Sequence, residues 1–237
     1  MSRLPVAILA GGLSTRLGSL TKAIPKALID VAGKPFIARQ LDYVRQQGIS
    51  RVVLCLGHLG EQVRAFVGDG AAFGLEACYS WDGPLLLGTG GALRRALPLL
   101  GKHFFVLYGD SYLLVDLGTV ERGFVESGKP ALMTVLRNDD QWDKSNVLFR
   151  DGSIIEYNKK VPGAEMKHID YGLGVLSASL LESMPTDCPF DLADIYHDLS
   201  AQGLLAGLEV SDRFYEIGSP GGLTETREYF RRKEKRV

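Results

Sequence analysis

Short apolar runs alternate with amphipathic stretches along the first half of the chain. The runs have the length of buried strands, and they cover Val6–Leu9, Arg51–Leu56, residues 75–79 and His103–Tyr108. Between them, apolar residues recur at helical spacing, as at Ile37, Leu41 and Val44. Such stretches predict helices over residues 35–48, about 61–66 and about 90–97. This order of elements predicts an α/β fold with a doubly wound, mostly parallel, Rossmann-like sheet.

The second half carries strand-like runs with fewer helical stretches between them. These runs cover residues 131–136, 147–149, Ser153–Tyr157 and 173–176. Strands that follow one another without crossover helices do not pair in parallel, so we expect mixed strands that form a lip over a substrate. A last helix is predicted from residue 220 onward, and its basic end at 231–236 is expected to be solvated. Because no repeat or linker separates the halves, we predict one domain over residues 1–237.

Positive and negative charges balance, since 27 Lys and Arg residues face 28 Asp and Glu residues among 237. A chain without a field of one sign is not drawn to nucleic acid or to an anionic membrane, so neither is expected as a partner. The cysteines, Cys55, Cys78 and Cys188, have no metal-binding spacing and indicate a reduced, cytoplasmic protein. From the short first apolar run we expect neither a signal peptide nor a membrane-spanning segment.

A glycine turn and two cations follow the first strand-like run. Gly11 and Gly12 end that run, and backbone without a Cβ can bring its N–H groups close to a ligand. Arg16 and Lys26 come next, and they are the cation types that bind phosphoryl oxygens best. The string is neither the P-loop pattern nor Gly-x-Gly-x-x-Gly. It predicts a site for a nucleoside triphosphate.

Residues 11–17, Gly-Gly-Leu-Ser-Thr-Arg-Leu, and the later Pro25-Lys26 resemble the signature of the sugar-1-phosphate nucleotidyltransferases, Gly-Gly-x-Gly-Thr-Arg-Leu followed by Pro-Lys-Pro. Ser14 and Ala27 depart from it, and Ser14 also resembles the Gly-Gly-x-Ser-x-Arg pattern of the molybdopterin nucleotidyltransferases. The resemblance implies a nucleotidyltransferase fold similar to glycosyltransferase A. It assigns nucleotide binding to residues about 1–115 and sugar-phosphate binding to about 116–237. The nucleotide contacts that it implies come from Leu9, Ala10, Gly11, Gly12, Thr15 and Arg16.

Two acids match the positions where this family holds Mg²⁺. Asp110 ends the apolar strand before it in a Gly-Asp pair, at the same sheet edge as the glycine turn if the strands are parallel. Glu216 stands where the family's Asp-x-Gly-Thr-Pro has its aspartate. Mg²⁺ is typically held by one or two carboxylates together with substrate phosphates. The resemblance therefore implies Mg²⁺ as the cofactor.

Further motifs resemble the segments that bind the base and the sugar phosphate. Gly88 and Thr89 begin a glycine-rich helix that matches the family's Leu-Gly-Thr-Ala/Gly-Gly beside the base, and the molybdopterin enzymes lack this segment. Residues 156–160 are similar to Glu-Lys-Pro, and residues 170–172 to Asn-x-Gly, with aspartate in place of asparagine. The sugar-phosphate contacts that the resemblance implies are Gly109, Asn158, Lys159, Asp170 and Gly172.

These motifs together imply transfer of a nucleotidyl group to a sugar 1-phosphate with release of pyrophosphate. Arg16 is expected to stabilise the pyrophosphate, and Lys26 and Lys159 the reacting phosphates, so that Arg16, Lys26 and Asp110 are the catalytic residues. Residues 82–91 and 108–112 are most similar to heptose- or mannose-1-phosphate guanylyltransferases, which favours GTP with D-glycero-D-manno-heptose 1-phosphate. UTP, CTP or dTTP with another sugar, a catalytically silent regulatory module and a molybdopterin nucleotidyltransferase stay as alternatives. A homodimer stays open as well.

Overall fold

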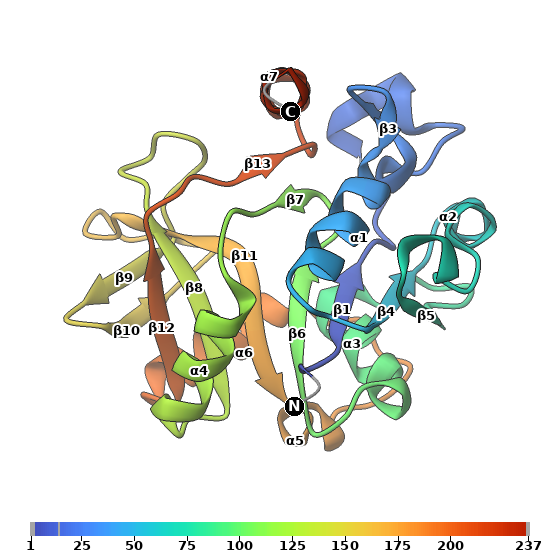
Figure 1. Ribbon diagram of the computed structural model, residues 1–237. Helices are drawn as coiled ribbons and strands as arrows, with labels where there is room; N and C mark the ends of the chain where they lie inside the picture. The colour runs from blue at the N-terminus through green and yellow to red at the C-terminus, as the bar shows by residue number, and fades with distance from the viewer. Residues whose placement is uncertain (1–2, 14, 236–237) are drawn as a thin grey trace.

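A nine-stranded sheet forms the centre of the computed structural model, which describes residues 3–13 and 15–235 (Figure 1). Within these residues the strand order is β5-β4-β1-β6-β11-β8-β12-β10-β9. The strands are β1 (Val6–Leu9), β4 (Arg51–Leu56), β5 (Glu76–Trp81), β6 (His103–Tyr108), β8 (Ala131–Arg137), β9 (Val147–Arg150), β10 (Ser153–Tyr157), β11 (His168–Ser177) and β12 (Leu205–Val210). Strands β5, β4, β1 and β6 are parallel, whereas β11 is antiparallel to both β6 and β8. The predicted α/β class, mostly parallel with a mixed second half, is confirmed.

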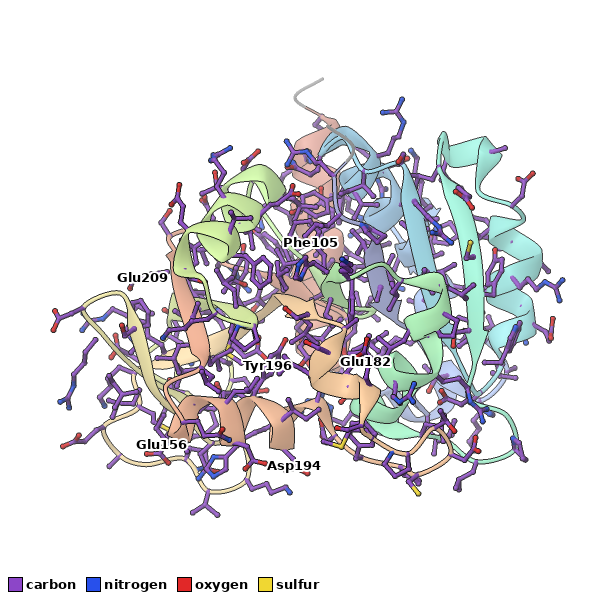
Figure 2. All side chains as sticks on the ribbon, turned by 90° about the horizontal axis from the view of Figure 1, so that it is seen from below. Phe105, Glu156, Glu182, Asp194, Tyr196 and Glu209 are labelled. Atoms are coloured by element: carbon purple, nitrogen blue, oxygen red, sulfur yellow. The ribbon has the colours of Figure 1, made fainter. Side chains whose placement is uncertain are left out.

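Helices cover both faces of this sheet (Figure 1). On one face pack α1 (Phe36–Gln46), α2 (Gly60–Val67) and α4 (Leu117–Ser127), and on the other α3 (Gly88–Ala96), α5 (Ser179–Glu182) and α6 (Leu192–Ala201). Helix α7 (Pro220–Glu234) lies above the sheet in Figure 1, in contact with residues 30–31 and 215–216. Alternation along β6 explains the two layers, since Phe105, labelled in Figure 2, and Leu107 join the first core and Phe104 and Val106 the second. Every one of these four side chains is buried.

Short elements connect the layers. They are the 3₁₀ helices η1 (Thr15–Thr21), η2 (Lys26–Leu28), η3 (Ala71–Phe73) and η4 (Leu97–Leu99), and the two-stranded ladders β2 (Asp30–Val31) with β3 (Lys34–Pro35) and β7 (Ser111–Tyr112) with β13 (Tyr215–Glu216). Among residues 3–13 and 15–235, no helix combines the length and the apolar character that crossing a bilayer requires.

Most predicted elements of the first half are confirmed, whereas several elements of the second half were missed. The bounds of β1, β4, β6 and β10 equal the predicted ones. The missed elements include α4, α5, α6 and β12. Helices α4 and α6 begin at an aspartate cap, because Asp116 accepts a hydrogen bond from the N–H of Thr119 at 2.6 Å and Asp191 one from the N–H of Ala193 at 3.0 Å.

The strand predicted at 173–176 is longer than expected. Strand β11 begins at His168 and continues to Ser177, with a shift in its register against β8 between Asp170 and Gly174. Gly172 lies within this irregular stretch and has a φ of 96°, which side chains rarely adopt. The motif expected to contact the sugar is therefore part of a central strand, at the point where its pairing is interrupted.

Candidate active site

A cavity of about 400 Å³ lies at the carboxyl ends of the parallel strands. The glycine turn after β1 forms one wall, and the first turn of α3 lies opposite. The residues that line it are Leu9, Ala10, Gly11, Gly12, Lys26, Ala27, Cys55, Asp82, Leu86, Gly88, Thr89, Ala92, Tyr108, Gly109, Asp110 and Lys159. Most of the residues predicted to bind the nucleotide are thus gathered in one place. The side chain of Thr15 and the whole of Ser14 lie outside the described part of the structure.

The main chain approaches itself closely around this cavity. A Cβ on Gly109 would lie 2.4 Å from the carbonyl oxygen of Leu9, and one on Gly11 would lie 2.9 Å from the nitrogen of Gly57. Neither position has room for a side chain. By contrast, a Cβ on Gly12 would meet nothing within 4 Å, so this glycine leaves open space beside the chain.

A second cavity, of about 320 Å³, adjoins the first. The two share Tyr108, Asp110 and Lys159 as lining residues. The second is lined as well by Arg16, Ser111, Trp142, Asp143, Asn146, Tyr157, Ile169, Asp170, Phe214, Glu216 and Ser219. A ligand in one cavity can therefore contact a ligand in the other beside Asp110 and Lys159.

Asp110 stands at the junction of the cavities. Its Oδ2 accepts a hydrogen bond from Lys26 Nζ at 2.7 Å, and both side chains are about one quarter exposed. The loop that carries it is held by Gln40, which is fully buried and donates from Nε2 to the carbonyl oxygens of Tyr108 at 2.9 Å and Ser111 at 2.8 Å. Sequence reasoning missed Gln40. The signal was a polar residue on the otherwise apolar face of α1.

Glu216 reaches the same junction from the end of the chain. The ladder of β7 and β13 pairs Glu216 with Ser111, and the N–H of Ile217 donates to the carbonyl oxygen of Asp110 at 2.9 Å. The carboxylate of Glu216 accepts hydrogen bonds from the N–H groups of Gly218 and Ser219 and from the hydroxyl of Ser219. These donors begin α7, where a negative charge is favoured.

Gly218 is the point where three charged groups meet. A Cβ on this glycine would lie 2.9 Å from Oε2 of Glu216, 3.1 Å from Oδ2 of Asp110 and 3.2 Å from Nη2 of Arg16. Residues 16, 110 and 216 lie far apart in the sequence, and only the resemblance to the family motifs indicated that they share a site. Gly218 was not among the predicted site residues, although it occupies the glycine of that motif.

The donor set fits a magnesium ion that is held partly by substrate. In the part of the chain that the structure describes, no three or more His, Cys, Asp or Glu side chains form a metal-binding group. Two carboxylates, Asp110 and Glu216, face one point, and Mg²⁺ usually takes one or two carboxylates and completes its shell with phosphate oxygens and water. Three hydrogen bonds already occupy Glu216, out of about four acceptor sites on a carboxylate. Asp110 therefore has the greater capacity to bind the ion.

The residues predicted to bind the sugar phosphate are only partly brought together. Lys159 lines both cavities, Gly109 lines the first and Asp170 the second. Asn158 and Gly172 line neither of the two. The side chain of Asn158 lies outside the cavities because it stabilises a turn, in which its Oδ1 accepts a hydrogen bond from the N–H of Val161 at 2.9 Å.

Asp170 has an unusual environment for a carboxylate. Its Oδ1 accepts the N–H of Gly172 at 2.9 Å and its Oδ2 the hydroxyl of Tyr108 at 3.3 Å, while its own N–H donates to Asn146. Burial raises the pKa of Asp170 to about 6, against the opposing effects of these bonds and of the positive charge of Lys159. Below about pH 6 this residue therefore holds a proton and can donate a hydrogen bond, as an asparagine would, whereas near neutral pH most of it is ionised.

Packing, as well as ligand binding, explains the glycines at the start of α3. A Cβ on Gly88 would lie 2.6 Å from the carbonyl oxygen of Phe190, and one on Gly90 would lie 2.3 Å from the ring of Phe190. The hydroxyl of Thr89 is occupied too, because it donates to Asp191 at 2.6 Å and accepts the N–H of Leu192 at 2.8 Å. Thr89 therefore has mainly its backbone to offer a nucleotide.

Asp191 links the two predicted halves of the site. One of its oxygens accepts from Thr89 and caps α6, and the other lies 4.0 Å from Nζ of Lys159. The neighbouring pair of Lys160 and Asp194 is exposed and lies outside both cavities. Figure 2 shows Asp194 on the outer side of α6. Sequence reasoning missed Asp191, whose signal was a cap residue before an apolar helix.

This chain is similar to sugar-1-phosphate nucleotidyltransferases of known name. The D-glycero-alpha-D-manno-heptose 1-phosphate guanylyltransferase of Campylobacter jejuni is 29% identical over 218 residues, which cover 90% of this chain and 94% of that protein. The UTP–glucose-1-phosphate uridylyltransferase of Synechocystis is 28% identical over 214 residues, or 83% of this chain. The chain spans 55% of that longer relative.

Solved structures and a family model agree with these relatives. The crystal structure of HddC from Yersinia pseudotuberculosis has a TM-score of 0.80 and 27% identity, covering 96% of this chain and 100% of that one, and the same protein has been solved in complex with GMP-PN. The family model described as the MobA-like NTP transferase domain matches residues 6–169. That range contains β1, the glycine turn, α3 and Asp110, which build the first cavity. The chain belongs to the family of MobA-like NTP transferase domains.

Proposed function

We propose that this chain joins a nucleoside triphosphate to a sugar 1-phosphate, giving a nucleotide sugar and pyrophosphate. The observation that carries the proposal is the pair of adjoining cavities that share Asp110 and Lys159. A phosphate oxygen of the sugar phosphate would attack the α-phosphorus, and the bond from that phosphorus to the bridging oxygen of pyrophosphate would break. Such a reaction needs mainly positioning and charge neutralisation.

Each charged residue has a role in this proposal. Lys26 and Lys159 hold the reacting phosphates, and Arg16 binds the departing pyrophosphate. Asp110 and Glu216 would hold Mg²⁺, which when bound neutralises phosphate charge. Gln40 keeps the Asp110 loop in place through its two hydrogen bonds. Since nucleoside triphosphates are the substrates, we propose that the enzyme works in the cytoplasm.

We further propose GTP and D-glycero-D-manno-heptose 1-phosphate as the substrates. The heptose guanylyltransferase of C. jejuni aligns over almost its full length, and the solved HddC binds a guanine nucleotide analogue. The Synechocystis relative acts on UTP and glucose 1-phosphate, so a uridylyltransferase is the second candidate. Cytidylyl and thymidylyl transfer are further ones.

The test is pyrophosphate release with Mg²⁺, GTP, UTP, CTP or dTTP, and heptose, mannose or glucose 1-phosphate. We expect turnover that requires both substrates, highest with GTP and the heptose. Turnover with UTP and a sugar phosphate, but not with GTP and any sugar phosphate, would exclude the guanylyl proposal. Binding of nucleotide without turnover on any sugar phosphate would favour the regulatory module instead, and turnover with molybdopterin would favour the third alternative.

Replacing Asp110 by asparagine tests the catalytic assignment. The variant Asp110→Asn should lower kcat by about 10²- to 10³-fold, because it removes a charge placed for the transition state, while the melting temperature changes little. Asp42→Asn is the matched control, because Asp42 also pairs with a lysine, Lys34, but on the exposed surface and outside both cavities. Near-normal activity of Asp110→Asn would refute the role.

A further inference from the structure

One polar side chain interrupts the buried face of α7. The helix buries Leu223, Thr226 and Phe230, which recur at helical spacing. Leu223 and Phe230 are apolar and join the first core, whereas Thr226 carries a hydroxyl and is fully buried. Burial of a hydroxyl costs free energy unless it is hydrogen-bonded, and a valine has nearly the same shape without that cost. The hydrogen bond that Thr226 makes therefore matters.

The hydroxyl of Thr226 reaches the main chain of Glu216. Its Oγ1 donates to the carbonyl oxygen of Glu216 at 2.7 Å. By contrast, the hydroxyl of Thr224, which is exposed on the same helix, donates to the carbonyl oxygen of Pro220 at 3.0 Å. The bond of Thr224 stays within α7. Of these two hydroxyls, only that of Thr226 ties α7 to β13.

The first turn of α7 holds the side chain of the same glutamate. The carboxylate of Glu216 accepts the N–H groups of Gly218 and Ser219 and the hydroxyl of Ser219, which in turn accepts the N–H of Gly222 at 3.0 Å. A Cβ on Gly222 would lie 1.5 Å from Oε1 of Glu216, so the helix packs directly against this carboxylate. Helix α7 therefore holds Glu216 at two points, its carboxylate and its main chain.

Helix α7 also contacts both strands of the ladder that joins the two acids of the site. The ring centroid of Tyr112, on β7, lies 4.7 Å from that of Phe230. Tyr215, on β13, stacks on Tyr229 with 4.1 Å between the centroids. A shift of α7 against this ladder would thus displace one carboxylate relative to the other. Because Mg²⁺ demands near-ideal octahedral geometry, such a shift should weaken its binding.

We propose that Thr226 is a positioning residue, which fixes the main chain of Glu216 so that its carboxylate can hold a divalent cation together with Asp110. This inference rests on the proposed nucleotidyl transfer, in which the two acids hold Mg²⁺. Thr226 lines neither cavity, so it touches neither substrate. It acts through Glu216, and its loss should weaken metal binding and leave the metal-free binding of nucleotide unchanged.

The experiment measures how much a divalent cation strengthens triphosphate binding. The dissociation constants of GTP, UTP, CTP and dTTP are titrated with and without Mn²⁺ and without sugar phosphate, so that no turnover is needed. Thr226→Val removes the hydroxyl and nearly keeps the shape. It should reduce the gain in affinity from Mn²⁺ about threefold to tenfold, the effect of one hydrogen bond. Thr224→Val, the matched control, should keep the full gain.

Thr226→Ser separates positioning from packing. Serine keeps the hydroxyl and loses a buried methyl group, so the melting temperature should fall while the gain in affinity from Mn²⁺ stays as in the wild-type protein. Thr226→Val should show the opposite pattern for the metal. If Thr226→Ser lowered the gain as much as Thr226→Val, or if Thr226→Val kept the full gain, the inference would be overturned.

Glu216→Gln tests whether the effect passes through Glu216. By itself it should reduce the gain from Mn²⁺ more than Thr226→Val does. Adding Thr226→Val to Glu216→Gln should then change the gain no further, because the positioned side chain has already lost its charge. Additive effects of the two substitutions, or a full gain in Glu216→Gln, would overturn the inference.

The outcomes separate this inference from the proposed function. A gain from Mn²⁺ that depends on Thr226, in a protein that releases no pyrophosphate with any sugar phosphate, would favour the regulatory module and still support the role of Thr226. Turnover in a protein whose gain is insensitive to Thr226→Val would leave nucleotidyl transfer intact and overturn that role. Absence of any gain from Mn²⁺ in the wild-type protein, with all four triphosphates, would overturn it as well.

Discussion

The two cavities that meet at Asp110 are built in different ways. The first is lined largely by short contiguous strings, such as residues 9–12 and 108–110, which follow parallel strands. The second is lined by scattered residues from segments between Arg16 and Ser219, which no local string contains. Close approaches of the main chain at Gly11 and Gly109 limit the first, whereas the second depends on side chains that are distant in the sequence. Changes in the two should therefore have different consequences.

Crowding the meeting point of the second cavity should have the largest effect. In Gly218→Ala the added methyl group would lie about 3 Å from Glu216, Asp110 and Arg16, so at least one of the three must move. A displacement of this size costs about 100-fold in kcat. Two quantities are measured, the kcat of pyrophosphate release and the melting temperature. The melting temperature should change little, because α7 still packs against β13.

Gly221→Ala is the matched control for Gly218→Ala. Gly221 lies in the first turn of α7, and a Cβ there would meet nothing within 4 Å. It should keep full activity. If both variants were equally active, the second cavity would not depend on the convergence at Gly218, and the contrast between the two cavities would be lost.

Ionisation of Asp170 as the pH rises should lower the free energy of unfolding, and we expect this effect to be of intermediate size. Because its pKa in the folded chain is about 6 and the ordinary value is 3.8, the folded state binds the proton more tightly than the unfolded state. The stability that the protonated group contributes is complete below about pH 4 and is lost as the pH rises through 6. Relative to Asp170→Asn, the wild-type protein should lose roughly 1 to 2 kcal/mol of unfolding free energy between pH 4 and 7.

Denaturant melts of both proteins from pH 4 to 7 check this expectation. Parallel curves for wild type and Asp170→Asn would contradict it. The wild-type protein and Asp170→Asn also show whether the two cavities bind different substrates, because Asp170 lines only the second cavity. The KM for the sugar phosphate should lose its pH dependence near pH 6 in Asp170→Asn, whereas the KM for the triphosphate should be the same as in wild type at each pH.

Removing the negative charge of Asp191, beside Lys159, should have the smallest effect on activity. Asp191→Asn keeps an oxygen for Thr89 but removes the negative charge 4.0 Å from Lys159. Both partners are about half exposed, so a pair of this kind is worth at most about 1 kcal/mol, or up to about fivefold in KM for the sugar phosphate. Asp194→Asn, which breaks the exposed pair with Lys160, should change nothing. A similar KM for both variants would show that Asp191 only caps α6.

Features formed by neighbouring residues, as in the first cavity, could be predicted from the sequence, whereas features formed by distant residues could not. Strand bounds such as Val6–Leu9 and His103–Tyr108 were predicted to the residue, because apolar runs and their glycine ends lie within a few positions. The first cavity was predicted from the glycine turn and from Gly88 for the same local reason. Helices α4 and α6 were missed, although Asp116 and Asp191 signal their starts.

Residues that act over long distances could not be predicted from local patterns. Gln40 is separated by 68 residues from Tyr108, whose carbonyl it binds, and nothing in a helical pattern indicates that contact. Asp82 resembles an ordinary turn residue until the fold places it beside Gly11. The prediction that Asn158 contacts the sugar phosphate came from the resemblance of residues 156–160 to Glu-Lys-Pro, and local sequence gave no sign that its Oδ1 accepts a hydrogen bond from Val161.

The ladder of β7 and β13 has a consequence for biosynthesis. It joins the strand after Asp110 to residues 215 and 216, so a nascent chain that has emerged only through β12 already contains every strand of the main sheet but lacks one of the two carboxylates. The first cavity can form while translation continues, and the second cannot. A ribosome-bound chain should therefore bind nucleotide before it can turn it over, and catalysis should begin only when the last segment has docked.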